Sequence, residues 1–541
     1  MRLIFLLIIA TSLFGCASDS LSRLNLNSLN SLTGSTYESF DGKYIDYQTQ
    51  QIRAETEVEK TAELGSLSSR MRSAADKNLI VNPYAELYLN EILEKLLAQW
   101  DQPLEKKVNI VISADRNYSA LATQDTIVVT QGVLADVESE DELAFIIAHE
   151  LSHILLKHQN SNEYFEKQSA LVSKATNVAM AAATIKDLDS SKTANGYKIV
   201  ARNSRESQEM VEKSYRIGVS INRLSRDVIS SSMSRTDEDE ADLLGIDLLV
   251  KAGYSPRAYK DTMERLESSL VFNKTQLEEK KKDFKSFVSM ATKANKNVTG
   301  LNWETVGYMA ANEAATNLLQ KFADRHNSPA ERKIDITAYV KREYRKERRQ
   351  NLTTKSLDAA LRKGKGKQVF ENYWAASEAF RALEYGDIKA AEKLARKATT
   401  GVTKYDAYTR LAFYSVRERQ NKQSKALQNL ALIKNWDSAS IQTFSLAAQA
   451  YRQQGKLDKA EEILNKGRQI IGISDPFLPQ YISVYKARGS EQEVQHYLEQ
   501  CKALDAENIV AQCYVAADLQ IPKKSDSKIG FLESLTKMIE I

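Results

Sequence analysis

The stretch DELAFIIAHELSHILLKHQN, residues 141–160, places two histidines and a glutamate inside a run that is otherwise apolar. A helix that is apolar around most of its circumference is buried, and buried imidazole and carboxylate groups need partners. His149 and His153 are four residues apart, so both rings project from one helical face, and Glu150 lies about 100° further round. This is the HExxH pattern, in which two imidazoles bind zinc and the glutamate acts as a base toward water beside the metal.

His158 lies five residues past His153, about 140° away from the face of the two ligands. This position predicts either a solvated side chain or one that supports a ligand from outside. The longer metzincin pattern is excluded, because Leu156 and Gln159 stand where it requires glycine and histidine. A third ligand is therefore expected further along the chain.

The segment SRTDEDEADLLGIDLLVKAGYSP, residues 234–256, predicts a helix with an acidic first turn and an apolar face, ending near Gly253. Glu238 and Asp242 are four residues apart and share one side of this helix. One carboxylate can then bind the metal while the other holds a ligand histidine. Charge alone does not distinguish Glu238 from Glu240, and an acidic first turn is also favoured simply by the helix dipole.

HELSH followed by SRTDEDEADLLG resembles the SRxxExEADxxG signature of the HtpX and CAAX-prenyl-protease family of gluzincins. Specifically, it resembles the exported bacterial branch of BepA-like and LoiP-like metallopeptidases. The resemblance covers roughly residues 75–345 and implies a zinc endopeptidase with one Zn²⁺ per chain. It also implies these roles: zinc ligands His149, His153 and Glu238, catalytic base Glu150, and supporting carboxylate Asp242.

Two β-branched runs, residues 108–112 and 127–130, predict strands beside the zinc helix. A hairpin or small sheet there would offer an edge to which a peptide substrate adds as a further strand. The alternative is a purely structural sheet.

The segment DRHNSPAERKIDI, residues 324–336, is similar to the family's His-Pro…Arg segment, although the proline is Pro329 and does not follow His326 directly. Two interpretations of His326 stay open. It either gates the site, as a fourth zinc ligand in a resting state, or lies on the surface at a helix start.

The N-terminus resembles a bacterial lipoprotein signal: a positive start, an apolar run over residues 3–14, and LFGC ending at Cys16. The resemblance implies lipidation of Cys16. Ala17 and Ser18 directly after it lack the aspartate that retains lipoproteins at the inner membrane, which favours anchoring on the periplasmic side of the outer membrane. A soluble periplasmic protein and an inner-membrane anchor are the alternatives. The remaining cysteines, Cys501 and Cys513, either form a disulfide in this oxidising compartment or stay as two buried thiols.

The C-terminal half repeats itself. The turn residues Gly386, Asn421, Gly455 and Gly489 recur at spacings of 35, 34 and 34 residues. This is the period of tetratricopeptide repeats, in which each helix pair packs against the next. The second repeat, which lacks a glycine, is the weakest match, and an unrelated helical bundle is the alternative.

These patterns predict a mainly α protein with a small β-sheet, in which a zincin-type metallopeptidase domain precedes a tetratricopeptide-repeat α-solenoid. The insertion between His153 and Glu238 is expected to be largely helical, and it either packs over the cleft as a lid or touches lipid. A second insertion, residues 270–323, contains the lysine-rich run EEKKKDF, which is typical of a solvated face. The predicted divisions are a lipoprotein signal peptide (1–15), an N-terminal tether and helix (16–75), the zinc metallopeptidase domain (76–345), a basic linker (346–370) and the repeat domain (371–541).

A net charge of +4 argues against a nucleic-acid partner. The first expected function is an exported, lipid-anchored zinc endopeptidase that cleaves misfolded or misassembled envelope proteins. Its repeats would dock substrates or the outer-membrane assembly machinery. The second is a chaperone-like adapter whose zinc site is closed or weakly active. The first is favoured, because a structural zinc site needs no Glu150 and usually has four protein ligands.

Overall fold

The computed structural model describes residues 42–48, 77–104, 106–158, 188–193, 196–201, 235–269, 328–504 and 507–519. The predicted signal peptide with Cys16, His326 and most of both insertions lie outside these residues. None of the helices within the described ranges combines the length and apolar character needed to cross a lipid bilayer.

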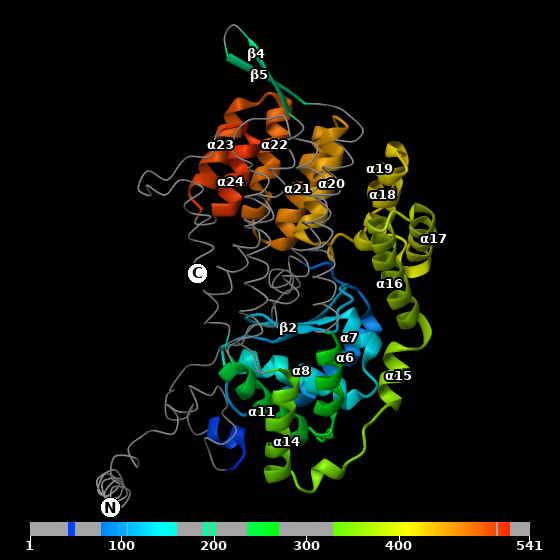
Figure 1. The fold of residues 1–541 in the computed structure, drawn as a ribbon, viewed down its shortest axis with the longest axis vertical. Helices are drawn as coiled ribbons and strands as arrows, with labels where there is room; N and C mark the ends of the chain where they lie inside the picture. The colour runs from blue at the N-terminus through cyan, green and yellow to red at the C-terminus, as the bar shows by residue number, and fades with distance from the viewer. Residues whose placement is uncertain are drawn as a thin grey trace, which may run out of the picture.

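The N-terminal half, the described residues up to Glu343, sets a small sheet beside a group of helices (Figure 1). Its unlabelled helices are short, at 44–48 and 258–269. Its labelled elements are α6 (Pro83–Leu97), β1 (Asn109–Ser113), β2 (Ala120–Ala122), β3 (Thr126–Thr130), α7 (Gln131–Asp136), α8 (Glu140–Leu155), β4 (Leu188–Thr193), β5 (Gly196–Ala201), α11 (Arg235–Lys251) and α14 (Pro329–Glu343).

The predicted small sheet is present, but its topology differs from a hairpin of the two predicted strands. Strands β1 and β3 pair in parallel, with Ile110 opposite Ile127. The hairpin forms instead between β3 and the short strand β2, which gives the order β1-β3-β2. Sequence analysis missed β2 because its residues, Ala-Leu-Ala, have little β-propensity. A separate antiparallel pair, β4 and β5, lies within the first insertion.

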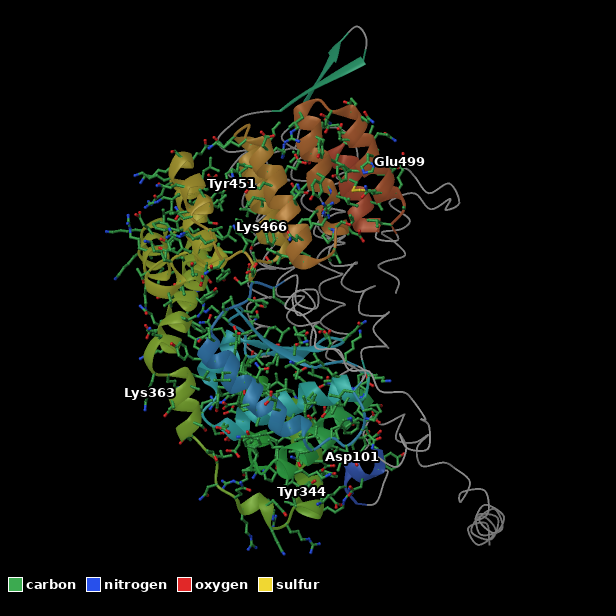
Figure 2. The ribbon with its side chains drawn as sticks, turned by 180° about the vertical axis from the view of Figure 1, so that it is seen from behind. Asp101, Tyr344, Lys363, Tyr451, Lys466 and Glu499 are labelled. Carbon is green, nitrogen blue, oxygen red and sulfur yellow. A yellow bond between two sulfur atoms is a disulfide. The ribbon has the colours of Figure 1, made fainter. Side chains whose placement is uncertain are left out.

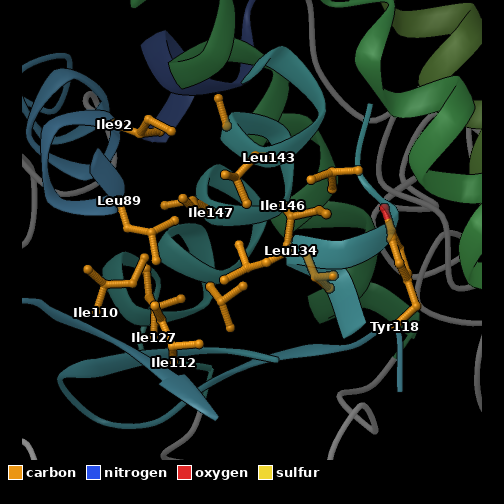
Figure 3. Close-up of a cluster of buried hydrophobic side chains, with 14 of the residues drawn as sticks. Leu89, Ile92, Ile110, Ile112, Tyr118, Ile127, Leu134, Leu143, Ile146 and Ile147 are labelled. Carbon is orange, nitrogen blue, oxygen red and sulfur yellow. The ribbon is translucent and has the colours of Figure 1, made fainter. Parts of the chain in front are cut away.

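Strands β1 and β3 are buried on both faces of the sheet. Ile110, Ile112 and Ile127 point into the core formed with α6 and α8, where Figure 3 shows them beside Leu89. Their neighbours Val111 and Val128 point the other way, into a cluster with residues of the C-terminal half. Continuous apolar runs such as NIVIS and TIVVT are typical of strands covered on two sides. The sheet therefore joins the two halves of the chain (Figure 1).

The C-terminal half, from Gly364 onward, consists of helical hairpins that follow one another along the chain. The hairpins are α16 (Gly364–Glu384) with α17 (Ile388–Ala398), α18 (Ala407–Arg419) with α19 (Gln423–Ala431), α20 (Ile441–Gln453) with α21 (Leu457–Ile471), and α22 (Leu478–Arg488) with α23 (Glu491–Lys502). Helix α24 (Glu507–Ala516) packs on the last pair, and 3₁₀ turns η3 (Gly401–Thr403) and η4 (Asp475–Phe477) precede α18 and α22.

The four turn residues identified from the sequence period all adopt left-handed backbone conformations. Gly386, Gly455 and Gly489 have φ of 79°, 70° and 75°, and Asn421 has φ of 56°. Asparagine is one of the few other residues that tolerate this conformation. The repeat without a glycine therefore makes the same kind of turn as the others. Cys501 and Cys513 form a disulfide between α23 and α24, drawn in yellow in Figure 2.

The segment predicted as a basic linker, residues 346–370, is structured and packed. It contains η2 (Glu347–Arg349), α15 (Lys355–Leu361) and the start of α16. Leu357 and Leu361, four residues apart on one helical face, are buried in the same core as α8. The lysines and glycines of LRKGKGKQ suggested a solvated linker. The structure corrects this prediction, because the apolar pair packs the segment into the core.

Candidate metal centre

Three predicted ligands converge between α8 and α11. The Nε2 atoms of His149 and His153 are 3.2 Å apart. The carboxylate of Glu238 lies 3.5 Å from His149 Nε2 and 3.7 Å from His153 Nε2. Ligands of a tetrahedral zinc ion, each about 2.0–2.1 Å from the metal, are about 3.3 Å from one another. The three side chains therefore fit a zinc ion held at these atoms.

The close approach of the two helices depends on Gly245. A Cβ atom at this position would lie 3.2 Å from the backbone nitrogen of His149 and 3.3 Å from its Cα. Glycine thus lets α11 pack directly against the turn of α8 that carries the first histidine. Helix α8 itself begins at a defined residue, because the side chain of Ser139 accepts a hydrogen bond from the backbone of Glu142.

Asp242 supports the first histidine from behind. Its Oδ1 lies 2.9 Å from Nδ1 of His149, which leaves Nε2 of that ring directed at the other two ligands. A carboxylate in this position fixes the ring orientation and the tautomer of a metal-binding histidine. Glu240, by contrast, contacts His158, so the geometry separates the two glutamates that charge alone left undecided.

Arg332 is a residue of the site that sequence analysis missed. Its guanidinium bonds both oxygens of Asp242, and Nη1 lies 2.8 Å from the carboxylate of Glu238. The signal was present in SPAER, since Ser328 and Glu331 form a capping box that starts α14 and places Arg332 in its first turn. The arginine compensates two buried negative charges at once.

The electrostatics of the ligands follow from burial and from these pairs. Burial alone would raise the pKa of Glu238, but Arg332 and the histidines hold it well below its usual range. Burial would lower the pKa of His149, yet the hydrogen bonds that it donates to Asp242 and Glu238 raise it to about 10. His153 is different, because burial and the charge of His149 lower its pKa well below 6.5. Metal binding therefore displaces a proton from His149.

Glu150 lies where α8 meets the edge of the sheet. Its side chain is buried, and the backbone of Ala122 in β2 is close enough to lower its pKa. Burial raises its pKa to about 7, while the charge of His149 lowers it and that of Glu238 raises it further. A carboxylate with a pKa near neutrality is suited to accept and then return a proton.

His158 is not the solvated residue that one of the two interpretations expected. It is buried, and its Nδ1 lies 2.9 Å from Nδ1 of His153. The helix ends at Leu155, and Lys157 takes a left-handed conformation with φ of 57°. This turn, rather than continued helical geometry, brings His158 back against His153. His158, Asp237 and Glu240 form a second group of potential ligand atoms within 4.8 Å of one another.

The structure thus brings His149, Glu150, His153, Glu238 and Asp242 into one place. Cys501 and Cys513 are paired elsewhere, in the C-terminal half. His326 and Cys16 lie outside the described residues, and their predicted roles stay predictions.

Residues 83–332 match the family model described as Peptidase family M48. The match begins at the start of α6, ends at Arg332, and includes all of the residues gathered around the candidate metal. It supports a zinc metallopeptidase of the HtpX and CAAX-prenyl-protease family. No curated protein matches the chain.

Proposed function

We propose that this protein is a zinc-dependent endopeptidase of the bacterial envelope, which cleaves misfolded or misassembled periplasmic and outer-membrane proteins. The observation that carries the proposal is the convergence of His149, His153 and Glu238, with Glu150 beside them. Two imidazoles and one carboxylate are the ligand set of catalytic rather than structural zinc, which usually has four protein ligands.

The residues divide the chemistry among them. A zinc ion held by His149, His153 and Glu238 supplies Lewis acidity toward water and toward the substrate carbonyl. Glu150 accepts a proton from the attacking water and returns it to the leaving amine. Asp242 and Arg332 keep the ligands oriented and their charges balanced throughout.

The substrate backbone is proposed to bind along β2. Within the described residues β2 pairs only with β3, so its outer edge is the free edge of the sheet on that side. Strand β2 packs against α8, and the backbone of Ala122 is close enough to Glu150 to lower its pKa, so this edge lies beside the proposed base. A peptide that adds as a further strand uses main-chain hydrogen bonds and makes small demands on side chains. Such recognition suits unfolded proteins of varied sequence.

The helical hairpins are proposed to be tetratricopeptide repeats that dock substrates or the outer-membrane assembly machinery. Their period, their left-handed turn residues and their sequential packing support this assignment. Lipidation of Cys16 and a position on the periplasmic side of the outer membrane complete the proposal, and these rest on the sequence resemblance alone.

The test is hydrolysis of a loosely folded envelope protein by the purified chain. Cleavage is expected to require zinc, to stop with a chelator, and to be lost in Glu150→Gln. Glu267→Gln, an exposed residue, is the matched control and should cleave at the parent rate. Cleavage that persists in Glu150→Gln at the parent rate would end the catalytic assignment.

One observation favours the second function, a chaperone-like adapter with a closed or weakly active site. The side chains of the three ligands are only 12%, 3% and 7% exposed, so the centre is nearly closed to solvent. The adapter predicts that Glu150→Gln restores a deletion strain fully. The same experiment should also test whether the helical hairpins are required. Point substitutions in the hairpins test this more clearly than removal of residues 371–541, because that removal exposes one face of the sheet.

A further inference from the structure

A chain of hydrogen bonds runs behind the second histidine ligand. Nδ1 of His153 lies 2.9 Å from Nδ1 of His158, and Nε2 of His158 lies 3.2 Å from the carboxylate of Glu240. The hydroxyl of Tyr44 faces the same carboxylate: burial, and then the charge of Glu240, raise its pKa. Both histidines are buried, whereas the carboxylate of Glu240 is about a quarter exposed, at 28%. These hydrogen bonds therefore lead from His153 outward to the partly exposed Glu240.

The geometry fixes where the protons lie when a metal is bound. A neutral imidazole that binds metal through Nε2 carries its proton on Nδ1. Nδ1 of His153 is then the donor toward His158, whose Nδ1 must be the acceptor. The remaining proton of His158 is consequently on Nε2, where it is donated to Glu240. Each ring nitrogen of His153 and His158 thus has a single role as metal ligand, donor or acceptor, and each donor faces an acceptor.

We propose that His158 and Glu240 are positioning residues that hold His153 with its Nε2 lone pair directed at the metal. This inference rests on the zinc binding of the proposed function and deepens it. His149 receives the equivalent support from Asp242, so each histidine ligand has its own support, one direct and one through a second imidazole. Removing such supports weakens metal binding by about 10–100-fold in known sites.

The segment 42–48 extends this support. The backbone nitrogen of Ile45 donates to Asp247 on α11, and that of Tyr44 donates to the hydroxyl of Tyr339 on α14. These two bonds fix the backbone around Tyr44, whose hydroxyl faces Glu240. The turn at His158 and helix α11 thus meet behind His153, and segment 42–48 is bonded to α11 through Asp247.

The same proton positions argue against a second resident ion at His158, Asp237 and Glu240. A cation there needs the lone pair on Nε2 of His158, which moves the proton of that ring to Nδ1. His153 would then have to accept at its own Nδ1 and carry a proton on Nε2, where the first metal binds. The first metal site and the group of His158, Asp237 and Glu240 need opposite positions for the same protons. A cation can therefore occupy one of the two sites but not both at once.

The experiment measures zinc affinity in the full chain, by competition with a chromophoric chelator, in a Glu150→Gln background that prevents self-cleavage. His158→Leu removes the hydrogen bonds to His153 and Glu240 and is expected to weaken zinc binding about 10–100-fold. His158→Gln keeps an acceptor toward His153 and a donor toward Glu240, so it should stay within about threefold of the parent. His496→Leu, the same substitution at an exposed histidine of α23, is the control and should leave affinity unchanged.

A second readout separates positioning from stability. The ligand-field spectrum of the cobalt-substituted protein should change in His158→Leu and return in His158→Gln. If His158→Leu does not fold, Glu240→Ala carries the test, since its side chain is partly exposed, and weaker zinc binding is again expected. Zinc affinity of His158→Leu, or in its place Glu240→Ala, within twofold of the parent would overturn the proposal. A parent protein that binds no zinc would instead contradict the proposed function, so the two failures are distinct.

Discussion

Arg332 donates two parallel hydrogen bonds to Asp242, from Nε to Oδ2 at 2.8 Å and from Nη2 to Oδ1 at 2.7 Å. The two residues are 90 positions apart in sequence and come from α14 and α11. A third nitrogen of the same guanidinium reaches Glu238 at 2.8 Å. One arginine therefore fixes both the carboxylate that would bind metal and the carboxylate that orients His149. Only a planar, forked donor can make these three contacts together.

The first prediction concerns this arginine. Arg332→Ala leaves two buried carboxylates uncompensated, which should lower the free energy of unfolding by about 3–5 kcal/mol. Zinc affinity should fall as well, because Glu238 loses a contact that orients it. Chemical denaturation of the zinc-free chain and chelator competition measure the two effects.

The matched control for this prediction is Arg342→Ala, on the same helix but in a partly exposed ion pair with its neighbour Glu343 and over the ring of Tyr339. It should shift the unfolding midpoint little, since such surface pairs contribute about 0–1 kcal/mol. Arg332→Lys retains the charge but not the fork, and should fall between parent and Arg332→Ala. Equal midpoints for Arg332→Ala and Arg342→Ala would refute the structural role given to Arg332.

The second prediction is a pH dependence of cleavage that arises from Glu150. Burial raises the pKa of this carboxyl to about 7. Because the base must be ionised, activity is present above this pKa and is lost as the pH falls through it. The positive charge of a bound metal lowers this pKa. The acidic limb of the pH–activity profile is therefore expected between the ordinary glutamate pKa of 4.5 and about 7. The measurement is kcat/KM against pH at saturating zinc, with metal content verified at each pH. An activity that increases steadily as the pH falls through this range would contradict the role of Glu150.

The third prediction tests the contact between the two metal-binding helices. Gly245→Ala places a methyl group 3.2 Å from the backbone of His149, and Gly245→Val adds more bulk. Alanine improves helix propensity over glycine by about 1 kcal/mol, so a simple helix effect would stabilise the protein. We expect the opposite, with zinc affinity and unfolding midpoint falling progressively from glycine to alanine to valine. Parent-like zinc affinity in Gly245→Val would show that this close approach does not position His149.

The sequence was most informative where a local period carries the chemistry. The spacing of His149 and His153 predicts two rings on one face, and the structure sets their Nε2 atoms 3.2 Å apart. The 34–35-residue period likewise predicts the turn residues, including Asn421, whose left-handed conformation replaces that of a glycine.

The sequence was less informative where the site depends on contacts between distant segments. Arg332 comes from a third helix, and no period or spacing in the sequence connects it with Asp242. His158 was placed by continuing the helix, but the chain leaves the helix at Leu155 and turns back. Strand β2 has too little β-propensity to be identified alone, and it forms because β3 and α8 provide surfaces on which it packs.

The last prediction concerns the influence of the C-terminal half on the edge strand. Arg116, in the connection that leads to β2, forms an ion pair with Glu378 and lies 4.2 Å over the ring of Trp374, both on α16. The backbone of the same connection is pressed against Gly132, where a Cβ atom would meet the carbonyl oxygen of Arg116 at 2.2 Å. Helix α16 thus holds the approach to β2 from outside the segment that matches the peptidase family.

Glu378→Gln and Trp374→Ala should therefore reduce peptide cleavage although neither residue touches the metal ligands. A cation–π contact and a partly exposed ion pair together hold about 1 kcal/mol, which corresponds to about a fivefold loss in kcat/KM. Zinc affinity should stay at the parent value, because α8, α11 and α14 are unchanged. Glu371→Gln, on the same helix but paired with exposed lysines, is the control and should cleave normally. A parallel loss of zinc affinity in Trp374→Ala would indicate general loosening of the fold. Unchanged cleavage in both variants would show that β2 is held without α16.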